Sequence, residues 1–266
     1  MIPIKSPKEI SIMRQGGEIL AAVLAELAKN IKPGITTAFL DELAEQLIYE
    51  KGALPGFKGF DGYPATLCTS INEEIVHALP SERKMQAGDI ISLDLGVLYP
   101  PEQCGACPMA GGCGGQRGLY TDAAITVAVG EISEEAKNLI VATRAALESA
   151  VRIIKPGQKL SKVSEAIQRK AEQAGFAVIR DLVGHGVGYE LHEDPQIPNF
   201  IDRNFRDVVL QEGMVLAIEP MLSLGSHAIK KSSDGFGFRT KDKSLAAHFE
   251  HTVAVTKNGG EVLTRI

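Results

Sequence analysis

The segment ISLDLGV (residues 91–97) has the alternating pattern of a β-strand, and one of its two faces carries an acid. Successive side chains of a strand point to opposite faces, so the leucines and Val97 share one face while Ser92, Asp94 and Gly96 share the other. Three more segments place one carboxylate among mostly small or polar neighbours: residues 122–127 with Asp122, 215–219 with Glu219 and 249–253 with Glu250. The sequence therefore predicts strands that each contribute one acid to a face of a sheet.

These four carboxylates indicate a metal site. A solvated face of an antiparallel sheet would explain any one of them, but such a face usually carries several charges. Four acids that converge without a cation repel one another and raise one another's pKa. Divalent metal ions resolve this conflict, and oxygen-rich ligation with little thiolate suits Mn, Fe, Co or Zn.

The stretch GHGVG (residues 184–188) supplies a nitrogen ligand, His185. It lacks the third glycine of a dinucleotide-binding loop, and no helix pattern follows it. Nor does the nearby HEDPQ (residues 192–196) form a zincin motif, because its last residue is not histidine. The glycines around His185 instead allow the backbone to approach a crowded centre closely.

Two pairs of helices, each followed by strands, indicate an internal duplication. A capping box at Ser6 to Glu9 begins the first helix, and IKPG ends a helix at both 31–34 and 154–157, an offset of 123 residues. Gly52 and Gly175 share this offset, as do Glu42 and Glu165. The alternative is that KPG is simply a common stop signal. We expect a single domain (1–266) of two halves, about 1–130 and 131–266, with the site where they meet.

The charge and composition of the chain argue against some classes of function. The 266 residues carry a net charge of −5, which argues against a partner held through nucleic-acid phosphates. The sequence has no apolar run of 18 residues and no apolar signal core at its start, so we expect no membrane span. Three of the four cysteines are crowded together rather than spread as a disulfide framework, which favours a cytoplasmic location.

Longer motifs resemble one family over nearly the whole chain outside the cysteine-rich stretch. They are GYPATLCTSINEEIVHALP, SLDLG, YTDAAITVAVG, GHGVGYELHEDPQIPNF, LAIEPML and RTKDKSLAAHFEHTVAVT. In these motifs the chain resembles the type I methionine aminopeptidases. The resemblance implies the α/β (α+β) pita-bread fold, in which helices cover a curved antiparallel sheet with pseudo-two-fold symmetry. It also implies metal-dependent removal of N-terminal methionine when the second residue is small.

The resemblance further implies a site with two divalent ions (Co, Mn, Fe or Zn). The matching ligands are Asp94, Asp122, His185, Glu219 and Glu250. Those matching Asp122 and Glu250 bridge the two ions in the family. By the same resemblance, Asp94 binds one ion, while His185 and Glu219 bind the other. Glu219 is also the residue that exchanges a proton with the attacking water.

Substrate contacts are implied in the same way. His77 and His192 match histidines that bond to the scissile peptide, although His77 as a loop cap stays an alternative. The implied methionine pocket comprises Phe57, Phe60, Tyr63, Cys68, Leu191 and Phe236. Phe57, Leu191 and Phe236 depart from the commonest family choices, which leaves the pocket's shape open. We interpret His248 and His251 as ordinary strand residues.

Three alternatives are weighed against this function. X-Pro peptidases share the fold but usually have an extra N-terminal domain, for which a first helix at residue 7 leaves no room. Type II aminopeptidases have a long insert where this chain has only 34 residues between His185 and Glu219. A non-catalytic binding module is disfavoured because all five ligands are present. We expect a monomer that acts on nascent polypeptide N-termini, without a nucleic-acid site, and a transient ribosome contact stays open.

Cys104, Cys107 and Cys113 lie in an insertion of about 100–118, between Asp94 and Asp122. We expect an excursion from a hairpin, near the rim of the site and outside its ligand set. Cys-x2-Cys is a familiar half of a zinc or iron–sulfur site, but no nearby histidine supplies a fourth ligand. A loop held by an extra metal and a plain or redox-labile loop both stay open.

Overall fold

The computed structural model describes residues 2–101 and 118–265. Its helices begin and end where the sequence signals them. Ser6 caps the first helix through the predicted box, in which the Glu9 amide donates to Ser6 Oγ and Glu9 accepts from the Ser6 amide. The four α-helices of the described residues are α1 (Pro7–Lys29), α2 (Thr37–Glu50), α3 (Glu134–Ile153) and α4 (Ser161–Gln173).

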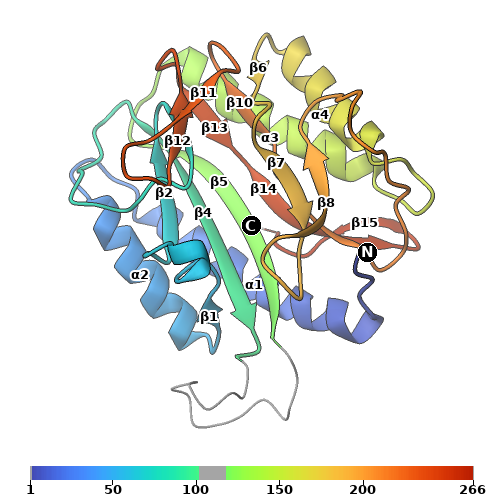
Figure 1. The fold of residues 1–266 in the computed structure, drawn as a ribbon. Coiled ribbons are helices and arrows are strands. Elements are labelled where there is room, and N and C mark those ends of the chain that lie inside the picture. The colour runs from blue at the N-terminus through green and yellow to red at the C-terminus, as the bar shows by residue number, and fades with distance from the viewer. Residues whose placement is uncertain (1, 102–117, 266) are drawn as a thin grey trace.

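Within the described residues, nine strands form one antiparallel sheet (Figure 1). Its order is β1-β4-β5-β14-β9-β7-β8, while β2 pairs with β4 and β15 with β14. The strands are β1 (Leu54–Pro55), β2 (Leu67–Ile71), β4 (Ile90–Tyr99), β5 (Leu119–Ala128), β7 (Val183–Gly186), β8 (Glu193–Pro198), β9 (Val215–Ile218), β14 (Glu250–Thr256) and β15 (Gly259–Val262).

Shorter strands form two further sheets at one end of the molecule. One has the order β13-β10-β6 and the other β11-β12-β3, and a 3₁₀ turn, η1 (Phe60–Gly62), precedes β2. Their strands are β3 (Glu74–Val76), β6 (Ala177–Val178), β10 (Met221–Ser223), β11 (Ile229–Lys231), β12 (Phe238–Thr240) and β13 (Ala246–His248).

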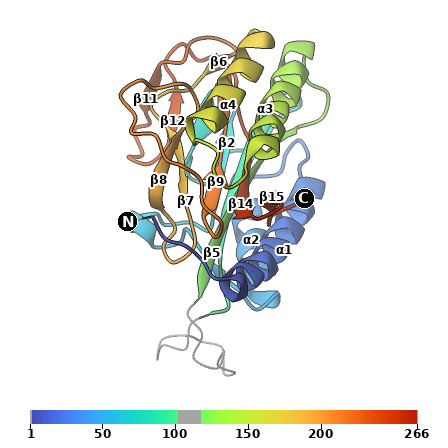
Figure 2. The ribbon, with the colours of Figure 1, turned by 90° about the vertical axis from the view of Figure 1, so that its right-hand side faces the viewer.

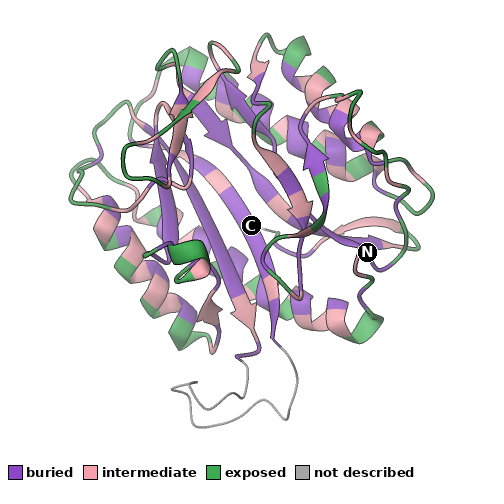
Figure 3. Cartoon of the chain, in the orientation of Figure 1, coloured by how far each residue is buried: buried purple, intermediate pink, exposed green. Residues whose placement is uncertain are grey.

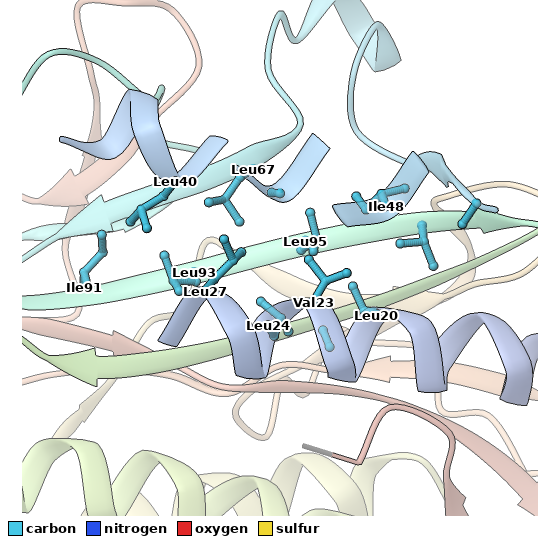
Figure 4. Packing of buried hydrophobic residues seen from close by; sticks show 14 of the residues in the cluster. Leu20, Val23, Leu24, Leu27, Leu40, Ile48, Leu67, Ile91, Leu93 and Leu95 are labelled. Atoms are coloured by element: carbon cyan, nitrogen blue, oxygen red, sulfur yellow. The ribbon is translucent and has the colours of Figure 1, made fainter. Parts of the chain in front are cut away.

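The helices cover one side of the nine-stranded sheet (Figure 2). Leucines of α1 pack there against the leucines of β4, in a fully buried cluster seen in Figure 4. Leu93 and Leu95 therefore face the helices, and alternation turns Asp94 to the opposite side, as the sequence predicted. A second cluster joins α3 and α4 to β9 and β14 through Leu147, Ile167, Leu216 and Val253.

The face that carries the acids is not solvated. Figure 3 shows the central strands buried along most of their length, and Asp94, Asp122 and Glu250 are among the buried residues. A solvated sheet face, the alternative explanation of a single acid, therefore does not apply to these three residues.

The register of the central strands brings the acids together. Asp94 of β4 lies opposite Ala124 of β5, and Glu250 of β14 lies opposite the same alanine from the other side. Asp122 is two residues from Ala124 and so lies on the same face as Asp94. The site thus forms where β4, β5 and β14 lie side by side in the sheet.

The helix pairs α1–α2 and α3–α4 correspond in order and in their ends. Gly34 and Gly157 follow the first helix of each pair, Gly52 and Gly175 the second, and all four have positive φ angles. This conformation favours glycine and accounts for the repeated stop signals. The α/β sheet covered by helices confirms the predicted fold class, while the division into halves at about 130 stays a prediction. Among the described residues, no helix is long and apolar enough to cross a membrane.

Candidate metal and substrate site

A cavity of about 320 Å³ opens on the face of the sheet that the helices leave free. Every residue that the sequence assigned to the two-ion site, the substrate contacts or the methionine pocket lines it. They are Phe57, Phe60, Tyr63, Cys68, His77, Asp94, Asp122, His185, Leu191, His192, Glu219, Phe236 and Glu250. The structure thus brings these candidate residues together, while the role of each stays a proposal.

At the base of the cavity, Asp122, His185 and Glu250 each offer a ligand atom, and these atoms lie within 4.8 Å of one another. His185 Nε2 is 3.6 Å from Glu219 Oε1 and 3.9 Å from Asp122 Oδ2. One imidazole nitrogen and carboxylate oxygens at this spacing form a donor set that suits divalent transition metals.

The hydrogen bonding of these acids also fits a cation. Among the described residues, Asp94 Oδ1, Asp122 Oδ1 and Glu250 Oε1 are buried without a hydrogen-bond partner. A buried acceptor without a partner costs about 1–3 kcal/mol, and more when it is charged. Coordination to a metal ion would satisfy these oxygens.

Burial sets the protonation of the cluster. It raises the pKa of Asp94 to about 7 and raises the pKa of Asp122, Glu219 and Glu250 well above the usual carboxyl range. Burial also lowers the pKa of His185 to about 3, so its imidazole is neutral and able to act as a ligand. The carboxyl groups ionise together only when positive charge neutralises them.

Glycines let His185 reach the cluster. A Cβ at Gly184 would lie 2.5 Å from the Ala217 carbonyl oxygen, and one at Gly186 would lie 2.2 Å from that of Asp194. No side chain fits at either position, so β7 approaches its neighbours closely only with glycine there. His185 Nδ1 lies 2.8 Å from the Gly186 carbonyl oxygen, which orients Nε2 toward the acids.

An apolar pocket adjoins the acids. Phe57, Tyr63, Cys68 and Leu191 pack as one cluster, with Phe60 and Phe236 against it. The Tyr63 hydroxyl is 3.1 Å from the Leu67 carbonyl oxygen, and its ring meets Phe236 edge-on at 5.5 Å. A slot lined by aromatic rings and a thiol suits a thioether side chain.

Two further histidines, His77 and His192, line the same cavity. The ring centroid of His192 is 4.4 Å from that of His185 and 5.0 Å from that of Phe60. His77 has a positive φ of 58°, a backbone strain that recurs at functional sites. Burial lowers the pKa of His77 to about 4 and lowers that of His192, so both rings are neutral hydrogen-bond donors at pH 7.

The sequence reasoning missed part of the site. Asp61, Lys231, Gly235 and Phe238 also line the cavity. His248, interpreted from the sequence as an ordinary strand residue, ends β13 with its Nε2 3.6 Å from Glu219 Oε2, a contact that this interpretation did not include. The strand period was the available signal, since His248 and Glu250 are two residues apart. His251 belongs elsewhere, and its Nδ1 is 3.1 Å from Thr264 Oγ1.

The predictions for Cys104, Cys107 and Cys113 fall outside the described residues. The flanking strands are described, and Tyr99 of β4 pairs with Leu119 of β5. The insertion therefore joins two paired strands that carry Asp94 and Asp122.

Comparison with known proteins agrees with the site. The model of metallopeptidase family M24 matches residues 11–257. The chain is 44% identical to methionine aminopeptidase 1 of Bacillus subtilis over 100% of both chains, and 46% identical to methionine aminopeptidase of Clostridium acetobutylicum over 99% of both.

Solved structures of a methionine aminopeptidase and of a prolidase are also similar to this chain. The crystal structure of methionine aminopeptidase from Thermotoga maritima has a TM-score of 0.90 and 45% identity, covering 100% of both chains. Prolidase from Pyrococcus furiosus has a TM-score of 0.73 and 25% identity, and the match covers 99% of this chain and 65% of that one. The predicted resemblance is confirmed.

Proposed function

The chain belongs to metallopeptidase family M24, and from this membership we propose that it is a methionyl aminopeptidase that removes the N-terminal methionine of nascent polypeptides. One observation carries the proposal. Acids and a histidine suited to a metal line the same cavity as an apolar pocket suited to methionine, together with two neutral histidines.

Asp94, Asp122, His185, Glu219 and Glu250 would hold two divalent ions. Their oxygen and imidazole donors accept Co, Mn, Fe or Zn, so the ligand set leaves the identity of the metal open. When bound, such ions supply a hydroxide near neutral pH and polarise a scissile carbonyl.

The protein's own groups would orient the substrate and move the proton. Glu219 lies beside His185 at the base of the cavity, where its carboxylate can take the proton of the attacking water. His77 and His192 are neutral and can donate hydrogen bonds to the scissile peptide as charge develops on it.

The aromatic cluster around Tyr63 and Phe236 would accept the methionine side chain. Because the acids lie beside this pocket, a methionine held in it presents the following peptide bond to them. We expect the next side chain to meet the crowded rim, so a small second residue is required.

The partners follow from this function. We propose a monomer that acts in the cytoplasm on N-termini emerging during synthesis, with contact to the ribosome at most transient. The net charge of −5 disfavours a direct nucleic-acid site.

The test is purification with native metal, elemental analysis, and assays with Met-Ala-Ser, Met-Leu and Ala-Pro peptides. The proposal expects cleavage of Met-Ala-Ser, much slower cleavage of Met-Leu and none of Ala-Pro. Turnover confined to Ala-Pro would identify an X-Pro peptidase. No turnover with any divalent ion would identify a non-catalytic binding module.

A further inference from the structure

His248 is the last residue of β13, and its side chain is only 1% exposed. Neither of its ring nitrogens has a hydrogen-bond partner among the described residues. Buried polar groups in native proteins nearly always have a partner, so the position of this imidazole needs an explanation.

The backbone of His248 is held in place by strand hydroxyl groups. Its amide donates to Thr126 Oγ1 at 2.9 Å, and the same hydroxyl is 2.8 Å from its carbonyl oxygen. Ser92 Oγ lies 2.9 Å from Thr126 Oγ1 and continues this contact to β4. These hydrogen bonds fix the position of the backbone from which the imidazole extends toward Glu219.

The ring points at one oxygen of a proposed metal ligand. Glu219 lies between two imidazoles, with Oε1 3.6 Å from His185 Nε2 and Oε2 3.6 Å from His248 Nε2. The two carboxylate oxygens therefore have different neighbours. Oε1 faces the side of Asp122 and His185, whereas Oε2 faces His248.

We propose that His248 is a positioning residue whose Nε2–H donates to Glu219 Oε2 and so directs Oε1 toward the metal ion. The proposal rests on the metal site of the proposed function. Hydrogen bonds from nitrogen to oxygen are about 2.7–3.2 Å long, so a shift of about half an ångström completes this one.

Partners that orient metal ligands change metal affinity by about 10- to 100-fold when they are removed. The decisive variants are His248→Leu, His248→Gln and His248→Asn. Gln places an amide N–H near the position of Nε2, whereas Asn places one near Nδ1 and leaves Oε2 without a donor. His251→Gln is the control, because His251 is a histidine of the adjoining β14 that lies outside the cavity.

The experiment measures the Kd for Co²⁺ by calorimetry and the visible spectrum of the Co²⁺-loaded protein. We expect Leu and Asn to raise the Kd at least about tenfold and to alter the spectrum. Gln and the His251 control should stay within about threefold of wild type. If the Leu variant fails to fold, as judged by circular dichroism, the comparison of Asn with Gln decides the question.

Wild-type affinity and spectrum in the Asn variant would overturn the proposal. A Gln variant as weak as Asn would also overturn it, because an amide N–H near the position of Nε2 would then not restore metal binding. These readouts need no peptide. A protein that binds Co²⁺ through His248-oriented Glu219 yet cleaves no methionyl peptide would refute the proposed function and leave the inference standing.

Discussion

The ammonium group of Lys5 forms an ion pair with the carboxylate of Glu193, and the two side chains are only 1% and 5% exposed. Glu193 also accepts hydrogen bonds from the amides of Tyr189 and Glu190, so it holds together the loop that contains His192. The ion pair therefore connects the N-terminal segment to the loop whose His192 lines the cavity.

Replacing Lys5 with Met should destabilise the protein by about 3–5 kcal/mol, because it leaves the Glu193 carboxylate buried without a counter-charge. Denaturant unfolding of the metal-free protein measures this loss. The matched control is Arg14→Met, whose partner Glu261 is equally exposed at 39%, and which should cost less than about 1 kcal/mol. Equal effects of the two variants would contradict a stabilising role for the buried pair.

Metal affinity should rise with pH. The Asp94 pKa is raised to about 7, so the metal-free protein holds a proton there below pH 7 that a cation must displace. The apparent Kd for Mn²⁺ should therefore fall about fivefold from pH 6 to pH 7 through Asp94 alone, and further if other acids also release protons. Calorimetry in buffers of different ionisation enthalpy counts these protons directly. A Kd independent of pH, with no proton release, would refute this account of the acids.

The protein should leave its own N-terminus intact. Residues 1 and 2 are Met1 and Ile2, and the proposed specificity requires a small residue after methionine. Intact-mass measurement after incubation with metal should find Met1 retained, whereas an Ile2→Ala variant should lose it. Removal of Met1 from the unaltered chain would contradict the proposed specificity.

The cysteines should lie outside the chemistry. A Cys104→Ser, Cys107→Ser, Cys113→Ser variant, purified anaerobically beside wild type, should keep its peptidase activity. Metal analysis of the same samples decides between the two alternatives for this insertion. One extra equivalent in wild type would indicate a metal held by the cysteines, and equal content would exclude it. A folded but inactive variant would show that the cysteines take part in the reaction.

The alternation of side chains along the strands was enough to predict that the acids lie on one face of the sheet. It placed Asp94, Asp122 and Glu250 away from the helices, and the structure finds all three buried beside one cavity. The capping box at Ser6 also formed as predicted, since both of its hydrogen bonds are local.

Contacts between distant residues were beyond such reasoning. Lys5 and Glu193 are 188 positions apart, and no local pattern links them. Phe238 reaches the cavity because β12 pairs with β3, a pairing that leaves no periodic signal in the sequence. His248 was within reach of the strand period, but the break between β13 and β14 concealed that it continues the pattern of Glu250.

The central claim is that metal held by the buried acids drives removal of methionine. Its most direct test is the initial rate of Met-Ala-Ser cleavage by metal-free protein titrated with Mn²⁺, for wild type, Glu250→Ala and the control Glu261→Ala, a partly exposed glutamate outside the cavity. We expect the wild-type and control rates to rise from zero with added metal, while Glu250→Ala shows no measurable cleavage at any concentration, because its loss leaves the cations under-coordinated. Substantial cleavage by metal-replete Glu250→Ala, or by wild type without metal, would contradict the claim.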